Sequence, residues 1–287
     1  MADSPQNKAL NWLIEQDIMN LTYESPNLVQ RYSIMVLFYS FSGDEWYNNE
    51  GYGSSDHECD WFGLKCKRGI SKITKIELQK NNLMGKLPKE VGTFSRLEWF
   101  RLYENGVHGT IPTEFGSLAA MEQLYLYSNR LSGTIPGEIS TCESLQKLRL
   151  QNNKFSGSIP SSIWELFCLE TLDLSSNQLV GTIDRSIQNL KNLHHLELHK
   201  NQLSGTIPSE LGLLVSLSEI RLGDNKIEGT IPSTLGLIDT LITLGLNTNK
   251  LSGTMPGEIC SMSLSALTAD CKDNTTGVVC PCCTLCF

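Results

Sequence analysis

The segment LHHLELHK (193–200) carries side chains that could hold a metal ion. If it is a β-strand, His195, Glu197 and His199 point to one face, because successive side chains of a strand alternate. Imidazole and carboxylate groups bind divalent cations, and histidine also titrates near neutral pH. A metal site and a pH-sensitive surface are therefore two interpretations of this segment.

Ion pairing is a third interpretation of the same acids. Asp173 lies 24 residues before Glu197, and Arg149 and Arg221 lie one further step of 24 away on either side. If residues at this spacing are neighbours in space, each acid has a cationic neighbour. We therefore favour an ion-pair network and predict neither a metal ion nor a cofactor.

The segment LEWFRLYEN could bind an organic ligand. Strand alternation would send Phe100 and Leu102 into the core and would leave three large polar or aromatic neighbours facing solvent. Trp, Tyr and Arg dominate the binding hot spots of protein interfaces. With the residues at the same spacing of 24, the predicted ligand-binding patch consists of Trp99, Arg101, Tyr103, Tyr125, Tyr127 and Arg149.

Self-stacking is the alternative for these side chains. Tyr125 lies between two arginines in the 24-residue series and could be satisfied by cation–π contacts. Tyr103 and Tyr127 could stack as a cross-strand pair. A binding role is the preferred interpretation, and the sequence does not choose between a peptide and a sugar as the ligand.

A period of 24 residues organises the middle of the chain. Eight units fill residues 73–264 without insertion, each close to LxxLxLxxNxLxGxIPxxLGxLxx. Their asparagines are Asn81, Asn105, Asn129, Asn153, Asn177, Asn201, Asn225 and Asn249. Because no unit can bury its own apolar side, the units must stack into a solenoid.

Each unit predicts a strand, a bend and a short helical turn. Positions 4 and 6, such as Leu196 and Leu198, point inward from the strand. The Asn amide is expected to bond to its own bend and to the neighbouring unit, forming a ladder, because buried backbone groups need partners. The Thr-Ile-Pro phrase is extended, and an α-helical or 3₁₀ turn closes the coil.

Two features of the repeats stand out. Asp184 occupies a position where every other unit has proline, which we attribute to drift at an exposed site. The residue after the repeated glycine is usually threonine: Thr110, Thr134, Thr182, Thr206, Thr230 and Thr254. A flat threonine ladder is one way in which ice-binding solenoids order water, so ice binding is an alternative to a simple preference for extended structure.

Ten cysteines lie mostly at the two ends of the chain. Cys59 and Cys66 end the segment CDWFGLKC, and six more crowd into the last 28 residues: Cys260, Cys271, Cys280, Cys282, Cys283 and Cys286. Clusters at both ends indicate disulfide-bonded caps in an oxidising compartment. The alternative for the C-terminal group is a reactive or metal-binding thiol cluster, although no histidine lies near it.

Two further observations concern the compartment. Cys142 takes an inward position filled by leucine in other units, and Cys168 is offset from it by two positions, which disfavours a bridge between them. The tripeptides that begin at Asn20 and Asn274 predict N-glycosylation. We therefore expect an extracellular or cell-surface location.

The repeat is similar to the leucine-rich repeat, and its LSGTIP phrase at 131–136 and 203–208 resembles the plant-type extracellular subclass. CDWFGLKC matches that family's N-terminal cap motif C-x-W-x-G-x-x-C, which implies a Cys59–Cys66 bridge. The phrase FYSFSGDEW and the ending LTADCKDNTTGVVCPCCTLCF look more like the repeat proteins of diatoms and related algae than those of land plants. The cap helix is expected over 31–46.

The resemblance implies an α/β solenoid, a leucine-rich-repeat superhelix with a parallel β-sheet on its concave face. It also implies a helical N-terminal cap and a cysteine-rich C-terminal cap. We predict that these three regions cover 1–72, 73–264 for the repeats, and 265–287.

Composition excludes several classes of function. The net charge is −8 and no basic run stands out, which argues against nucleic acid, because phosphate binding needs clustered Lys and Arg. The longest apolar stretch, near 32–41, is too short to span a bilayer. Motifs for nucleophilic, phosphate-binding or zinc-dependent catalysis are missing from the sequence, so we predict no enzyme activity.

The predicted function is non-catalytic extracellular recognition of a protein, peptide or glycan through the concave face. A receptor-like ectodomain, an adhesion module and an inhibitor all fit this description. Ice binding and a structural role in a cell wall or matrix are the alternatives. Any membrane anchor would come from segments outside this chain.

Overall fold

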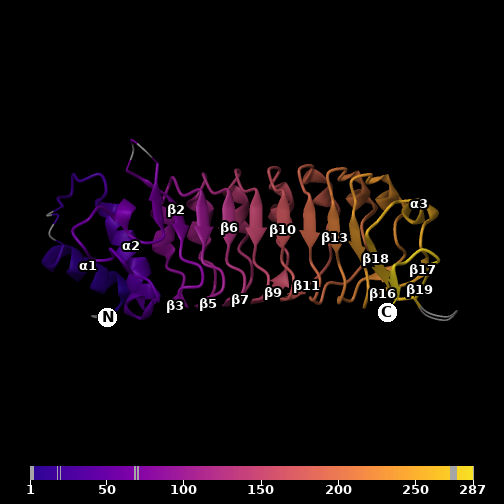
Figure 1. Ribbon diagram of the computed structural model, residues 1–287, viewed down its shortest axis with the longest axis horizontal. Coiled ribbons are helices and arrows are strands. Elements are labelled where there is room, and N and C mark those ends of the chain that lie inside the picture. The colour runs from indigo at the N-terminus through magenta and orange to yellow at the C-terminus, as the bar shows by residue number, and fades with distance from the viewer. Residues whose placement is uncertain are drawn as a thin grey trace. The chain divides into compact units, whose positions relative to one another are not determined.

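The computed structural model describes residues 3–17, 19, 21–67, 69, 71–271 and 277–286. The chain divides into two compact units. The first unit comprises 1–132 and 138–145, and the second comprises 133–137 and 146–287. Each unit contains stacked coils of the repeat (Figure 1).

Two α-helices open the first unit. α1 (Pro5–Glu15) begins after Ser4, whose hydroxyl accepts a hydrogen bond from the backbone N–H of Asn7. Proline at the first helical position has no N–H to leave unsatisfied. α2 (Leu28–Ser40) packs against α1 and has mostly buried side chains.

The predicted cap helix over 31–46 is wrong at its C-terminal end. Ser42 takes the left-handed conformation with a φ of 54°, which an α-helix of L-residues does not allow. Gly43 then passes so close to Phe38 that a Cβ on Gly43 would lie 2.1 Å from the phenyl ring. A short 3₁₀ helix (Gly43–Glu45) replaces the last helical turn that we expected.

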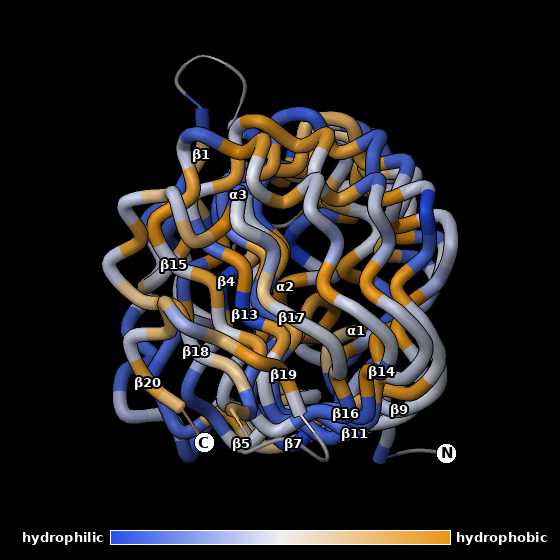
Figure 2. Tube along the Cα trace, turned by 90° about the vertical axis from the view of Figure 1, so that its right-hand side faces the viewer, coloured by the Kyte–Doolittle hydropathy of each residue, from blue (hydrophilic) through white to orange (hydrophobic). Residues whose placement is uncertain are grey.

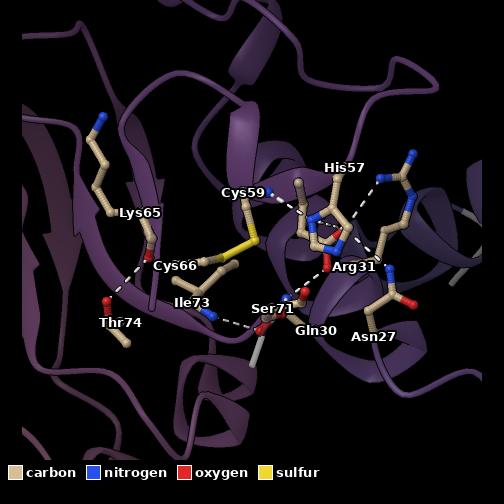
Figure 3. Close-up of a disulfide and its surroundings, with 11 residues drawn as sticks. Asn27, Gln30, Arg31, His57, Cys59, Lys65, Cys66, Ser71, Ile73 and Thr74 are labelled. Atoms are coloured by element: carbon tan, nitrogen blue, oxygen red, sulfur yellow. Dashed lines mark hydrogen bonds and ion pairs between the residues drawn. A yellow bond between two sulfur atoms is a disulfide. The ribbon is translucent and has the colours of Figure 1, made fainter. Parts of the chain in front are cut away.

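Arg31 connects α2 to the rest of this cap from a fully buried position (Figure 3). Its Nε donates to Asp17 Oδ2 at 2.7 Å, and its Nη1 lies 3.4 Å from Glu58 Oε2. The rings of Trp12 and Trp61 have their centroids 5.2 and 4.8 Å from its Cζ. A buried charge is tolerated when it is paired and hydrogen-bonded, so these five residues, the Arg31 cluster, act together.

A disulfide between Cys59 and Cys66 closes the cap next to this cluster (Figure 3). Cys59 lies in a short 3₁₀ helix (Glu58–Asp60), and Cys66 ends β1 (Leu64–Cys66), which pairs antiparallel with β2 (Ile73–Glu77). Gln30 on α2 links both sides, since its amide donates to Glu58 Oε1 at 2.7 Å and accepts from Ile73 N at 2.8 Å. The bridge, the strand pair and α2 therefore form one structure.

The coils of the first unit build two parallel sheets. The main sheet continues from β2 to β4 (Trp99–Arg101) and β6 (Gln123–Tyr125), and each strand is in register with the strand one repeat later. The smaller sheet contains β3 (Met84–Lys86), β5 (Gly106–Gly109) and β7 (Arg130–Gly133). Short 3₁₀ helices close the coils at Lys89–Thr93, Thr113–Ser117 and Gly137–Thr141.

The second unit repeats this plan. Its main sheet contains, in order, β8 (Lys147–Arg149), β10 (Thr171–Asp173), β12 (His195–Glu197), β13 (Glu219–Arg221), β15 (Thr243–Gly245), β18 (Ala266–Ala269) and β20 (Leu285–Cys286). Smaller pairs join β9 (Lys154–Ser158) to β11 (Gln178–Val180), β14 (Glu228–Gly229) to β16 (Lys250–Leu251), and β17 (Gly253–Thr254) to β19 (Val278–Val279). The helical turns are Ser161–Glu165, Arg185–Asn189, Ser209–Leu213, Ser233–Leu237 and the α-helix α3 (Gly257–Cys260).

The apolar side chains of the repeat fill the interior of each unit. Phe100 and Leu102 in the first unit, and Leu196 and Leu198 in the second, have no exposed surface. Hydrophobic and hydrophilic residues alternate along the coils (Figure 2). The predicted inward positions are thereby confirmed.

The repeated asparagines form the expected ladder of hydrogen bonds. In one rung, the Asn201 amide donates to Leu198 O of its own coil at 3.1 Å and to Leu174 O of the preceding coil at 2.9 Å. Its Oδ1 accepts from Leu179 N of the preceding coil at 3.0 Å. One side chain therefore satisfies backbone groups of two coils.

The residue before each repeated asparagine is left-handed although none of these residues is glycine. The φ angle lies between 53° and 56° at Lys80, Glu104, Ser128, Asn152, Ser176, Lys200, Asp224 and Thr248. This conformation costs an L-residue roughly 1–2 kcal/mol. The ladder stabilises it, because the same bend presents its carbonyls to the asparagine amide.

Different residues end the ladder in the two caps. In the first unit, Asn81 accepts from Asn48 N and donates to Asn48 O, both at 2.8 Å. In the second unit, the Asp270 carboxylate accepts from the backbone N–H groups of Thr248 and Asn249, both at 2.6 Å. The terminal coils therefore leave no bend without a partner at these positions.

Three disulfides close the C-terminal region: Cys260–Cys282, Cys271–Cys286 and Cys280–Cys283. Cys142 and Cys168 are free thiols, the first buried and the second exposed. The predicted glycosylation sites Asn20 and Asn274 lie outside the described residues. The predicted boundaries of the three regions stay a prediction.

Within the described ranges, every helix is too short or too polar to cross a bilayer.

We predict that Asn201→Ala lowers the free energy of unfolding by about 3 kcal/mol, because it strips partners from buried backbone groups that cost about 1–3 kcal/mol each when left unsatisfied. Gln202→Ala is the control, since this neighbouring side chain is exposed and should change stability by less than about 0.5 kcal/mol. Urea unfolding followed by circular dichroism measures both. Equal losses for the two variants would contradict the role of the ladder.

Candidate functional site

The predicted patch residues of the first unit lie on neighbouring strands. Lys75, Trp99 and Gln123 are in register across β2, β4 and β6, and so are Glu77, Arg101 and Tyr125. Their side chains leave the main sheet on the side opposite the core, which we call the sheet face. Because the backbone register is fixed, each side chain on this face meets the one from the next coil.

Trp99 is only half exposed, since cations cover its ring. Lys75 Nζ lies 3.0 Å from the ring centroid, and Arg101 Cζ lies 4.1 Å from it. The indole N–H donates to Glu122 Oε2 at 3.3 Å. Trp99 is therefore held in one orientation by groups on three coils.

Arg101 lies at the centre of the patch and is held on several sides. Its Nη1 donates to Glu77 Oε1 at 2.9 Å, and its Nη2 donates to Gln123 Oε1 at 2.5 Å. Its Cζ also lies 5.1 Å from the centroid of the Tyr125 ring. The guanidinium group thus links neighbouring strands and fixes the aromatic rings beside it.

The tyrosines complete a stacked aromatic surface. The rings of Tyr103 and Tyr127 are 4.4 Å apart at an interplanar angle of 8°, and Tyr125 lies tilted beside Tyr127 at 6.3 Å. All three are half-buried. The contacts expected for self-stacking are therefore present, and they build a rigid surface in which Trp99, Arg101, Tyr103, Tyr125 and Tyr127 keep part of their area exposed.

Arg149 belongs to the second unit and lies beside Asp173 across β8 and β10. Asp173 is 6% exposed, and its Oδ1 accepts from the Ser175 hydroxyl at 2.7 Å and from Ser175 N at 3.1 Å. Burial raises the pKa of Asp173 above its ordinary value, and the two hydrogen bonds partly offset that rise. Whether Arg149 contacts a ligand stays a prediction.

On the sheet face of the second unit, the carboxyl group of Glu197 has a strongly shifted pKa. Burial raises its pKa to about 7, and the negative charges of Asp173 and Glu219 contribute to the rise. Glu219 itself pairs with His195 Nδ1 at 3.3 Å and with Arg221 Nε. Burial of the carboxyl group is therefore the main cause of the shift, and the neighbouring negative charges add to it.

His199 completes the group that sequence analysis considered for a metal ion. Burial lowers its pKa, which favours the neutral imidazole. Among the described residues, ligand atoms converge closely enough for one ion only at Cys271, Cys280 and Cys283. Those three cysteines form disulfides, so their sulfur atoms are not free thiolates. The ion pairs that form here join Glu219 to His195 and to Arg221, so Arg221 pairs with Glu219 and not with Glu197 as the favoured network had it.

Sequence analysis did not single out a small pocket on the sheet face of the second unit. It has a volume of about 260 Å³, and its lining includes His199, Arg221, Gly223, Gly245, Asn247 and Thr268. A Cβ on Gly223 would lie 2.8 Å from Asn247 Oδ1, whereas Gly245 has ordinary space around it. Glycines at outward strand positions of neighbouring repeats are the signal that could have revealed this hollow.

Comparison with known proteins gives matches to a repeat family and to solved structures. Models described as leucine rich repeat match residues 120–142, 144–166 and 167–227. The chain is similar to the plant peptide hormone receptor RGFR1 in complex with RGF2, at 37% identity and a TM-score of 0.65 over 68% of this chain and 31% of the receptor chain. It is also similar to the ectodomain of the Arabidopsis receptor kinase HAESA in complex with an IDA peptide hormone, at 32% identity and a TM-score of 0.67 over 72% and 35% of the two chains.

The chain therefore spans about a third of each of these receptor chains. A plant ice-binding protein is matched over more of its length, at 25% identity and a TM-score of 0.70 over 85% of this chain and 86% of that chain. No curated protein matches the sequence at a significant level.

The pKa of Glu197 predicts how stability depends on pH. The ordinary value is 4.5 and the folded value is about 7, so between them the folded chain binds more protons than the unfolded chain. Stability from this group is therefore present at low pH and falls as pH rises through that window. Glu197→Gln should remove this fall, so the variant gains melting temperature relative to the parent between about pH 5 and pH 8.

Differential scanning calorimetry across this pH range measures the difference. His199 contributes the opposite sign, because its pKa is lowered, but it is present in both proteins and cancels in the comparison. Glu228→Gln, at an exposed position, is the charge-matched control. Parallel pH profiles for the parent and Glu197→Gln would refute the prediction.

Proposed function

Because the chain is a leucine-rich-repeat protein of the kind found in plant receptor ectodomains, we propose that it is a non-catalytic extracellular module that binds an extended peptide. The proposed site is the sheet face of the first unit. The observation that carries the proposal is the patch of Trp99, Arg101, Tyr103, Tyr125 and Tyr127, whose side chains are already held by one another.

Preorganisation is the physical argument for binding at this patch. Ordering a large side chain on association costs about 0.5–1.5 kcal/mol, and here the stacking and the Arg101 hydrogen bonds have ordered it in advance. Aromatic and arginine side chains at the centre of a contact contribute most of its energy. A rigid, half-exposed group of this kind therefore suits recognition better than a flexible surface would.

The surroundings of Trp99 favour a peptide over a sugar. Sugars are commonly held against an open aromatic face, but Lys75 and Arg101 occupy the Trp99 ring. A peptide can use the edges of the aromatic rings together with two carboxylates, that of Glu122, which accepts from the Trp99 indole, and that of Glu77, which accepts from Arg101. The peptide hormones in the RGFR1 and HAESA complexes support this choice of ligand class.

The disulfides support placement of the chain outside the cytosol. Four bridges close the two caps of this protein, and such bonds persist in oxidising compartments. We propose an extracellular or cell-surface location, with a role as a receptor-like ectodomain. No catalytic step is assigned to any residue.

The test uses a phage-displayed peptide library selected on the whole protein. Tyr103→Ala and Trp99→Ala should each weaken a selected peptide by about 2 kcal/mol, as hot-spot truncations do. Both variants should change the free energy of unfolding by less than about 1 kcal/mol, whereas Phe100→Ala in the core should lower it by about 3–5 kcal/mol. Asn247→Ala, on the sheet face of the second unit, is the control.

Surface plasmon resonance gives the affinities. Selected peptides that bind Tyr103→Ala and Trp99→Ala as tightly as the parent would rule out the patch. A library that yields no binder, together with glycan-array binding that Tyr103→Ala abolishes, would rule out the peptide class.

Ice binding is the second candidate function, because the plant ice-binding protein is matched over 86% of its chain. The threonine column is exposed at Thr110 in the first unit and at Thr134, Thr182, Thr206, Thr230 and Thr254 in the second. If this column binds ice, the protein should show thermal hysteresis in nanolitre osmometry, and Thr206→Lys should reduce it. A freezing point equal to the melting point would exclude this function.

A further inference from the structure

The second unit has a groove of about 830 Å³ at the smaller sheet, away from the sheet face. It is lined by residues of three consecutive coils: Thr182, Ile183, Asp184, Arg185, Gly205, Thr206, Ile207, Pro208, Ser209, Glu210, Thr230 and Pro232. The smaller sheet is interrupted here. After β11 only a single bridge, Thr182 to Ser204, continues it, and paired strands resume at β14.

The groove contains the residue that interrupts the series of repeated prolines. Asp184 stands where the other seven units have proline, and its carboxylate accepts from Ser186 N at 2.7 Å. This hydrogen bond holds the pKa of Asp184 below its ordinary value, so the exposed side chain is an anion. The position therefore adds an oriented carboxylate where a proline ring would otherwise lie.

Threonine hydroxyls form one wall of the groove. Thr182, Thr206 and Thr230 repeat at the coil spacing of about 4.8 Å, and all three are exposed. A Cβ on Gly205 would lie 2.8 Å from the Thr182 methyl group. Glycine at this position therefore lets the threonine of the preceding coil pack against the next coil. Within the described part of the chain these three hydroxyls have no hydrogen-bond partner.

Charged side chains also line the groove. Arg185 is 84% exposed, and its Nε lies 3.8 Å from Glu210 Oε1. The Ser209 hydroxyl donates to Glu210 Oε2 at 3.2 Å. With Asp184, the groove carries two carboxylates and one guanidinium, a formal charge of −1.

We propose that this groove binds a neutral oligosaccharide. Sugar hydroxyls both donate and accept, and the groove offers carboxylate acceptors, a guanidinium donor and threonine hydroxyls that do both. Pro232, which is partly exposed, supplies apolar surface for the C–H faces of the rings. The volume lies within the roughly 300–1,000 Å³ of ordinary ligand sites.

The charge decides against an acidic polysaccharide. A carboxylated or sulfated chain would meet Asp184 and Glu210 with only Arg185 to compensate, and Arg185 already lies beside Glu210. The site shares no residue with the patch proposed for peptide binding. Either proposal can therefore fail without affecting the other.

The test is isothermal titration calorimetry of the whole protein with cellohexaose, laminarihexaose and mannohexaose, with an oligogalacturonate as the charged probe. At least one neutral probe should bind. Asp184→Pro, which restores the repeat pattern, and Thr206→Val, which keeps the shape of the side chain, should each weaken that probe about tenfold, the worth of one good hydrogen bond. Thr110→Val, at the same repeat position in the first unit, should leave affinity unchanged.

Asp184→Asn keeps the capping oxygen, so it provides a second variant if Asp184→Pro does not fold, and it should also weaken binding. Circular dichroism verifies the fold of each variant. The proposal is overturned if no neutral probe binds the parent protein at millimolar concentration, if the oligogalacturonate binds more tightly than every neutral probe, or if Thr110→Val loses as much affinity as Thr206→Val.

Discussion

The bend that follows each strand of the main sheets is the constraint on which the other features depend. Each bend needs one residue in the left-handed conformation, at a cost of roughly 1–2 kcal/mol, and it exposes backbone groups that no strand can satisfy. The asparagine after that residue satisfies them in its own coil and in the preceding one. Because the amide must reach both coils, neighbouring coils keep the same length, and this explains a repeat without insertions.

The first and last coils each lack a neighbouring repeat on one side, so a residue of the cap must satisfy the backbone groups there. The two caps use different residues for this. Asn48 takes the first rung in the first unit, and the Asp270 carboxylate takes the last rung in the second. The first cap is then held by the buried Arg31 cluster and by the Cys59–Cys66 bridge. The second is held by three disulfides, which suit a region with few large apolar side chains.

Because the register of the coils is fixed, side chains 24 residues apart lie side by side on the sheet face. In the first unit this register brings Trp99, Arg101 and the tyrosines into a stack that satisfies itself and remains half-exposed. In the second unit it half-buries Glu197 beside Asp173, and burial together with the neighbouring negative charge raises the pKa of Glu197 to about 7. The same backbone therefore carries a rigid aromatic surface in one unit and a proton-sensitive acidic one in the other.

Sequence alone determined the features that recur with the repeat. The inward positions, the asparagine ladder and the stacked coils follow from local spacing, because each coil contacts only its neighbours and each repeat restates the same contacts. The aromatic patch could also be read from residues 24 apart, although its burial could not.

Tertiary structure decided whatever depends on contacts that occur once. The end of α2 depends on Gly43 meeting the Phe38 ring, and the burial of Arg31 depends on Asp17 and Glu58, which lie far from it in the sequence. The pairing of the six C-terminal cysteines has no repeat to predict it. The groove at Asp184 appears only when three coils are placed side by side, because no single repeat contains enough of its lining to show it.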